Sequence, residues 1–237
     1  MPPSDRLHAL KCALRPAAPA APARVAAPPA AAAAAAAAVA DGVLPRYCPA
    51  DLRAFGAGLL EQAGMEAGMA RIIAQCCVEG DLLNHSTHGM RLLFTAIDGV
   101  LKGTQACAGE PTVLRDTGST LSWDGAVDGR PLNGLYLTHQ AVAAALARAH
   151  EHGVATVVVR RSGHTGCLQA FLEAATSDGC MLIIASSGLG VRSVAPFGGT
   201  TGTLHPNPFA VGIPATPYPI LVCTHHSMLT LQLLQYT

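Results

Sequence analysis

Apolar residues recur at helical spacing in three segments between residues 45 and 103. Pro49-Ala50-Asp51 is a helix-start signal, and Leu52, Phe55 and Leu59 then follow on one face. The pattern predicts three helices, running from Pro49 to Gly64, from about Glu66 to Asn84–His85, and from about Met90 to Gly103. Three short helices before any strand form a helical subdomain, which needs another layer to pack on.

After residue 110 the pattern changes to short apolar and β-branched runs. Thr112–Arg115 and Ser119–Trp123 are predicted strands joined by a turn. Val154–Val159 and Cys180–Ala185 are nearly continuous apolar runs, which are typical of strands buried on both faces. The remaining predicted elements are two helices and one strand, at Leu132–His152, Cys167–Ser177 and Phe209–Ile213.

The order strand, helix, strand from Val154 to Ala185 predicts a right-handed crossover and a parallel pair. The loop Ser162–Gly166 then follows the carboxyl end of a strand and precedes a helix, with free backbone N–H groups that suit a phosphate or carboxylate. Ligands bind at that edge of open α/β sheets. The fold class is therefore α/β, with a helical subdomain (45–103) before a ligand-binding domain (104–222).

The first 44 residues differ in composition from the rest. They consist of Ala, Pro and a few Arg, and they cannot bury enough varied apolar surface to fold alone. The alanine run at 30–40 is too short and too weakly hydrophobic to span a bilayer. The basic, acid-poor bias is compatible with an organelle transit peptide or with a low-complexity extension. We expect a cytoplasmic protein, or a plastid or mitochondrial one if the arm is a transit peptide.

Charge and cysteine usage exclude several function classes. The net charge is +0, and only 13% of residues are charged, so nothing favours binding to nucleic acid or to an anionic membrane. The eight cysteines contain no C-x-x-C pair, which argues against structural zinc and for reduced thiols in an intracellular compartment. A metal-dependent hydrolase using His85, His88 and His164 stays open as an alternative.

Polar chemistry is concentrated in the segment from Asp81 to Arg91, which holds two imidazoles, two hydroxyls, a carboxylate and a guanidinium. The second helix leads into this segment, and Gly89 is expected to break it and leave His88 at a helix end. His164 lies in the loop Ser162–Gly166, where a structural role and a catalytic role both remain possible. Gly188-Leu189-Gly190 lacks the rest of a dinucleotide fingerprint, so a Rossmann cofactor site is not supported.

Four ordered blocks resemble the malate/L-lactate dehydrogenase family, which is unrelated to the Rossmann-type enzymes and also includes sulfolactate and ureidoglycolate dehydrogenases and cyclic imino acid reductases. The blocks are Asp81-Leu82 through Ser86-Thr87-His88-Gly89, Gly153 through Gly166, Val194-Ala195-Pro196-Phe197-Gly198-Gly199, and Asn207-Pro208-Phe209-Ala210 with Ile213-Pro214. The resemblance covers about 45 to 222. It implies a non-Rossmann NAD(P)-binding body with a mixed or parallel sheet, commonly in a homodimer.

The resemblance also implies roles for individual residues. His88 would donate or accept the proton at the substrate oxygen or nitrogen, and Thr87 would orient it. Arg91 is our candidate for the carboxylate of a small 2-hydroxy or 2-keto acid, because a guanidinium binds that group with two hydrogen bonds. The residues expected along the NAD or NADP cofactor are Ser162, Gly163, His164, Thr165, Asn207 and Pro208.

The chain departs from the family pattern in two places. His205-Pro206 precedes Asn207 where the family has Gly-Thr or similar, and Cys223 occupies the position of an Asp thought to complete the relay with the His and the hydroxyl. From residue 223 to 237 the tail shows no resemblance, which predicts a C-terminally truncated α/β domain. The alternative to an active dehydrogenase is therefore a catalytically inactive homologue that retains only nucleotide binding or dimerisation.

Overall fold

The structure is a computed structural model that describes residues 46–188 and 192–225. The predicted arm at 1–44, part of the Gly188–Gly190 segment and most of the predicted tail lie outside these residues. The helices are α3 (Pro49–Gln62), α4 (Ala67–Leu82), α5 (Leu92–Leu101), α6 (Gly134–His152), the 3₁₀ helix η1 (Leu168–Phe171) and α7 (Leu172–Ser177). The strands are β1 (Thr112–Asp116), β2 (Thr120–Asp124), β3 (Ala126–Val127), β4 (Arg130–Pro131), β5 (Thr156–Arg160), β6 (Leu182–Ala185), β7 (Phe209–Ile213) and β8 (Ile220–Thr224).

The three predicted N-terminal helices are confirmed as α3, α4 and α5. Pro49 takes the first position of α3, where its missing N–H costs nothing. The break after α4 differs from the prediction, because the helix ends at Leu82 and Asn84 then adopts a left-handed φ of 63°. Gly89 therefore does not end this helix; His88 lies in the loop that follows it.

The sheet pairing corrects the predicted crossover. β5 pairs in parallel with β2, and α6 lies in the connection between these two strands. β1 pairs with β2 on its other side as an antiparallel edge strand. β6 does not pair with β5, because it joins a separate antiparallel sheet in the order β6-β7-β8. The short η1–α7 segment packs on that second sheet, where Gly212 of β7 lies against the side chains of Leu172 and Thr176.

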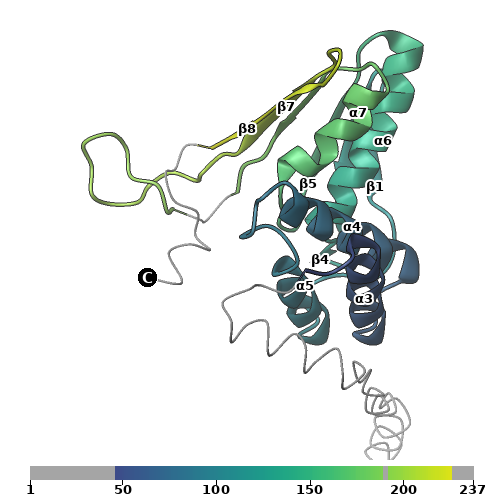
Figure 1. Ribbon diagram of the computed structural model, residues 1–237, viewed down its shortest axis with the longest axis vertical. Coiled ribbons are helices and arrows are strands. Elements are labelled where there is room, and N and C mark those ends of the chain that lie inside the picture. The colour runs from purple at the N-terminus through teal and green to yellow at the C-terminus, as the bar shows by residue number, and fades with distance from the viewer. Residues whose placement is uncertain (1–45, 189–191, 226–237) are drawn as a thin grey trace, which may run out of the picture. The chain divides into compact units, whose positions relative to one another are not determined.

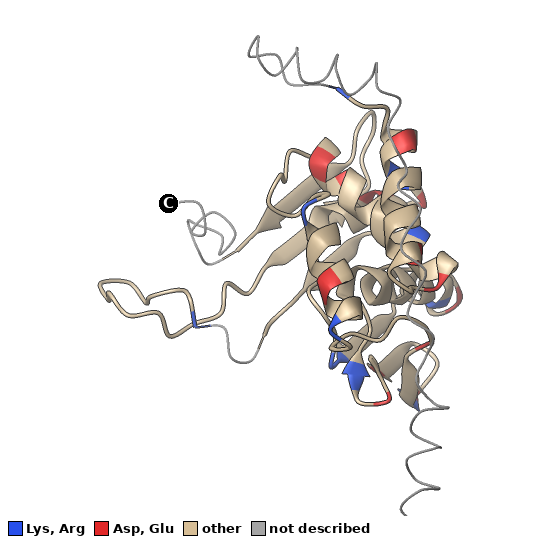
Figure 2. Ribbon diagram, turned by 90° about the horizontal axis from the view of Figure 1, so that it is seen from below, with Lys and Arg blue, Asp and Glu red and all other residues tan. Residues whose placement is uncertain are grey.

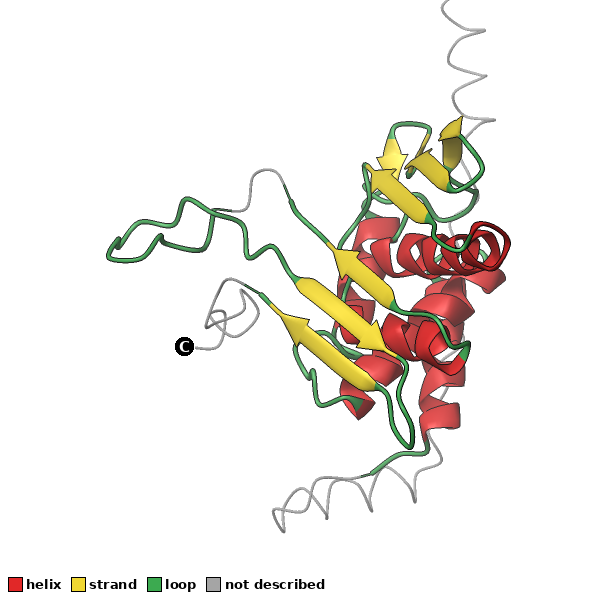
Figure 3. Ribbon diagram, turned by 90° about the horizontal axis from the view of Figure 1, so that it is seen from above, coloured by secondary structure: helices red, strands yellow, loops and turns green. Residues whose placement is uncertain are grey.

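One face of the β6-β7-β8 sheet packs on η1 and α7, and the other face is exposed among the described residues (Figure 3). Ile183 is 56% exposed, and Val158 of β5 is 54% exposed, so the prediction of strands buried on both faces is wrong. None of the strands β6, β7 and β8 carries a Lys, Arg, Asp or Glu (Figure 2). The described helices include none with both the length and the hydrophobicity needed to cross a membrane.

Helix α6 packs against α4, which also contacts α3 and α5 (Figure 1). Asn133 caps its start by accepting a hydrogen bond from the Leu135 N–H at 2.9 Å, and Gly153 ends it with a left-handed φ of 79°. Its buried side chains share one core with α3, α4 and α5. The core members from α6 and its flank are Leu132, Leu135, Tyr136, Leu137 and Val142.

Two glycines allow loops to lie directly against helices. A Cβ at Gly80 of α4 would lie 2.6 Å from the carbonyl oxygen of His88, and one at Gly134 of α6 would lie 2.3 Å and 2.4 Å from the carbonyl oxygens of Gly163 and His164. Only a residue without a side chain permits such approaches. The loops that carry His88 and His164 are therefore held by backbone packing.

Gly80 and Gly58 form a matched pair, because both lie inside helices but only Gly80 touches another segment. Gly58→Ala should raise the free energy of unfolding by about 0.5–1 kcal/mol, since alanine favours helix and meets nothing within 4 Å. Gly80→Ala should lower it by about 1–3 kcal/mol through overpacking against His88. Urea unfolding measures both values, and equal stability of the two variants would contradict the packing argument.

Candidate active site

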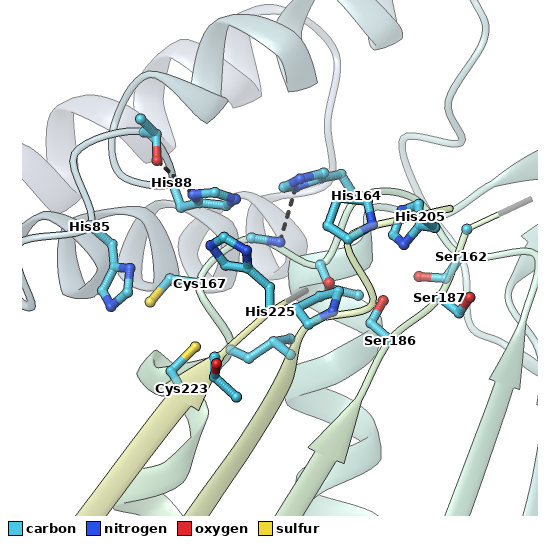
Figure 4. A pocket seen from close by; sticks show the side chains of 18 of the residues that line it. His85, His88, Ser162, His164, Cys167, Ser186, Ser187, His205, Cys223 and His225 are labelled. Carbon is cyan, nitrogen blue, oxygen red and sulfur yellow. Dashed lines mark hydrogen bonds between the residues drawn. The ribbon is translucent and has the colours of Figure 1, made fainter. Parts of the chain in front are cut away.

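A cavity of about 520 Å³ opens where the β6-β7-β8 sheet meets the loops after α4 and β5 (Figure 4). β6 and β8 run in the same direction and β7 runs opposite, so the ends of β6 and β8 and the start of β7 meet at one edge. The lining residues are His85, Thr87, His88, Ser162, Gly163, His164, Thr165, Gly166, Cys167, Leu168, Ser186, Ser187, Gly188, His205, Pro206, Pro208, Cys223, Thr224 and His225.

His88 and His164 come from different loops and stack on each other in this cavity. Their ring centroids are 5.4 Å apart, with an angle of 25° between the ring planes. The Oγ1 atom of Thr87 lies 2.8 Å from Nδ1 of His88, which fixes the ring and leaves Nε2 for a ligand. The Gly166 N–H donates to Nδ1 of His164 at 3.0 Å, so neutral His164 carries its hydrogen on Nε2.

Desolvation favours the neutral form of both imidazoles by lowering their pKa values. Desolvation, followed by the charges of His164, His85 and His225, lowers the pKa of His88 to about 4. Burial is also the largest cause of the lowered pKa of His164, with a smaller contribution from His205. A neutral His88 can accept a proton without first losing one.

Asp124 fixes the start of the His164 loop and was not singled out from the sequence. Only 3% of this residue is exposed, and its carboxylate accepts hydrogen bonds from Nε of Arg160 at 3.0 Å, Nε of Arg161 at 2.7 Å and the Nη2 atoms of both. These guanidinium groups, Arg161 above all, hold the pKa of the Asp124 carboxyl well below its usual range. The end of β2 is thereby tied to the end of β5, immediately before Ser162.

The His164 loop has fewer free amides than the sequence suggested. The Gly163 N–H donates to the Leu132 carbonyl at 3.1 Å, and the Gly166 N–H is bound to His164. The loop leads into the four-residue 3₁₀ helix η1 rather than directly into an α-helix. The prediction of free amides at a helix N-terminus is therefore wrong for Gly163 and Gly166.

The cavity gathers most of the predicted site residues. His88, Thr87, Pro208 and the loop 162–165 all line it. Asn207 lies beside it in a smaller hollow, where its Oδ1 accepts from the Ser187 hydroxyl at 2.8 Å. Arg91 is exposed at the N-terminus of α5 and does not belong to the lining.

Several cavity residues were not assigned a role from the sequence. Ser186 and Ser187 follow β6, and Thr224 and His225 end β8, so the rule that ligands bind beyond strand ends could have identified them. His205 lines the cavity and accepts a hydrogen bond from the Asn207 N–H on Nδ1 at 3.1 Å. Among the described residues, the lining has five histidines and no Lys, Arg, Asp or Glu.

The described residues give no support to a metal site made of His85, His88 and His164. Their ring nitrogens do not all lie within 4.8 Å of one another. His85 is instead engaged with Gln169, whose Oε1 lies 3.1 Å from the His85 Nε2.

Comparisons with known proteins agree on one family. The family model described as malate/L-lactate dehydrogenase matches residues 48–229. Hydroxycarboxylate dehydrogenase B of Escherichia coli O157:H7 is 26% identical over 178 residues, which are 75% of this chain and 48% of that protein. L-sulfolactate dehydrogenase of Methanothermobacter thermautotrophicus is 31% identical over 152 residues, covering 64% and 42%. The chain spans about half the length of the curated relatives it matches.

Solved structures agree with this result. The malate dehydrogenase of Entamoeba histolytica matches with a TM-score of 0.74 and 25% identity, over 81% of this chain and 52% of that one. The malate dehydrogenase of Pyrococcus horikoshii OT3 matches with a TM-score of 0.73 and 26% identity, over 81% and 53%. With the family model matched over residues 48–229, the chain belongs to the malate/L-lactate dehydrogenase family.

Proposed function

We propose that the chain carries the proton-transfer and nicotinamide part of a 2-hydroxy-acid dehydrogenase site. The reaction is hydride transfer between NAD or NADP and C2 of a small 2-hydroxy or 2-keto acid. The observation that carries the proposal is the half-buried His88, which is hydrogen-bonded to Thr87 and stacked on His164 at the cavity wall. Family membership supports an oxidoreductase that acts on a CH–OH group.

Thr87 suits His88 to both directions of the reaction. A hydroxyl can donate to the His88 Nδ1 atom or accept from it. When it accepts, Nε2 is bare and takes the proton from the substrate hydroxyl during oxidation. During reduction the ring starts as the imidazolium, whose Nε2–H gives its proton to the substrate oxygen while Nδ1–H stays bonded to Thr87, and the neutral ring is left. A single hydrogen bond of 2.8 Å can therefore hold the ring in both protonation states.

The lining offers groups that suit a nicotinamide ring. Hydroxyls of Ser162, Thr165 and Ser186 could bond a carboxamide, and the prolines and imidazoles offer flat apolar faces. The residues that would hold the cofactor are Ser162, Gly163, His164, Thr165, Asn207 and Pro208. NAD or NADP would supply the hydride acceptor or donor when bound. Arg91, the candidate from the sequence for the substrate carboxylate, lies outside the described lining, so the geometry of the cavity does not support that role. Assembly as a homodimer is part of the same proposal.

His88→Gln should lower the rate by about a hundredfold or more, because glutamine keeps a polar group near Thr87 but cannot take up the proton. The measurement is NAD- or NADP-dependent oxidation of malate, lactate and sulfolactate, followed by the absorbance of the reduced nicotinamide. His152→Gln, which changes a histidine outside the cavity lining, is the matched control. Retention of more than about a tenth of the activity by His88→Gln would contradict the role.

A substitution at Cys223 distinguishes the active dehydrogenase from the inactive homologue, and the active dehydrogenase makes the prediction that follows. That residue lines the cavity where the family pattern has Asp. Cys223→Asp should raise turnover at least about tenfold, because a carboxylate stabilises the imidazolium formed on His88. Cys223→Asn, of nearly the same size, should not. Cofactor binding without turnover in the wild type, together with no gain from Asp, would favour the inactive homologue.

The low pKa of His88 also predicts how stability depends on pH. In the unfolded chain this ring binds its proton near pH 6.5, whereas in the folded protein it does so only near pH 4. The wild type should therefore lose about 2 kcal/mol of unfolding free energy relative to His88→Gln as the pH falls from 6.5 to 4. Urea unfolding of both proteins across that interval measures the difference, and a constant difference would disprove the lowered pKa.

A further inference from the structure

Three side chains of different chemistry converge at the far end of β6 from the cavity. One ring nitrogen of His150, one carboxylate oxygen of Asp178 and the sulfur of Cys180 all lie within 4.8 Å of one another. His150 and Asp178 are exposed and Cys180 is partly buried, so solvent reaches the group. No other set of three such donors meets this limit among the described residues.

The backbone holds the three donors on rigid turns. His150 lies in the last turn of α6, which Gly153 closes by donating its N–H to the Ala149 carbonyl at 2.7 Å. After α7, the N–H groups of Asp178 and Cys180 both donate to the Ala175 carbonyl, at 3.1 Å and 2.9 Å. Gly179 between them has a left-handed φ of 74°, which directs both flanking side chains from one tight turn.

We propose that His150, Asp178 and Cys180 bind a zinc ion, with the fourth position open to water. Thiolate and imidazole together select Zn²⁺ over Mg²⁺ and Ca²⁺, which prefer oxygen ligands. The Nε2 atom of His150 is 2.5 Å from Oδ2 of Asp178, and the ion replaces this hydrogen bond by bonding to both atoms. As the ion binds, the hydrogen on His150 Nε2 moves to Nδ1 or is released to solvent, and the Cys180 thiol releases its proton to solvent as the Zn–S bond forms. Nothing is oxidised or reduced.

Such an ion would join two segments that are distant in sequence. α6 leads into β5, and Cys180 leads into β6, so the ion would tie the starts of these two strands together. It would act on stability rather than on the cavity, because none of its three ligands lines the cavity. Zinc should therefore raise the unfolding temperature, and the rise should grow with the logarithm of the zinc concentration once this exceeds the dissociation constant.

The experiment is a titration of the full chain with Zn²⁺, and with Co²⁺ as a spectroscopic probe, while the thiols are kept reduced. The wild type should bind one ion with a thiolate-to-cobalt charge-transfer absorption. Cys180→Ser should remove that absorption. Cys180→Ser and His150→Gln should each weaken zinc binding by about a hundredfold. Circular dichroism checks the fold of each variant, which surface positions should preserve.

Two matched variants decide where the ion sits. His152→Gln changes a neighbouring histidine of the same helix end and should leave binding unchanged. Cys223→Ser changes a thiol in the histidine-lined cavity and should also retain the absorption. Loss of the absorption in Cys223→Ser but not in Cys180→Ser would place the ion in the cavity and overturn the proposal. Equal zinc affinity of Cys180→Ser and the wild type, or no binding by the wild type, would do the same.

Discussion

The stacking of His88 on His164 depends on two places where glycine lets backbone lie against backbone. Gly80 brings the His88 loop onto α4, and Gly134 brings the His164 loop onto the start of α6. Because α4 and α6 share one core, these two contacts fix the distance between loops that are far apart in sequence. The hydrogen bonds from Arg160 and Arg161 to Asp124 then fix the start of the His164 loop. The hydrogen bond between Thr87 and His88 fixes the orientation of the His88 ring. The site is thus a consequence of packing, refined by a few polar contacts.

The antiparallel order β6-β7-β8 supplies the opposite wall of the cavity. With strands running alternately, the polar residues after β6 and β8 and those before β7 reach the same edge. The strands themselves have no charged side chains, so one of their faces can pack on η1 and α7 through apolar contacts alone. The outer face of this sheet, with Ile183 and Val222, has no cover among the described residues.

Local patterns predicted the helices and five of the eight described strands, because each depends on residues close together in the chain, but they did not predict β3, β4 or β8. The pairing of β6 could not be predicted in this way, since a strand's partner depends on where distant segments pack. Helix α4 ends at Leu82, two residues before the predicted end at Asn84–His85, and the residue with a left-handed φ after it is Asn84 rather than Gly89. The resemblance to the family indicated that His88 and the loop 162–165 belong to one site, and both line the same cavity. Asp124 lies outside the four resembling blocks, so its contact with Arg160 was not anticipated.

The composition of the lining has a consequence for an anionic substrate. A 2-hydroxy acid carries a carboxylate, and the described lining offers five imidazoles but no fixed positive charge. Burial alone disfavours the imidazolium form of His88, but a carboxylate beside the ring favours that form. In the proposed reaction, the proton that His88 takes from the substrate hydroxyl would provide the counter-charge of the carboxylate. Proton transfer and charge compensation would then be one event, in a described lining that has no lysine or arginine.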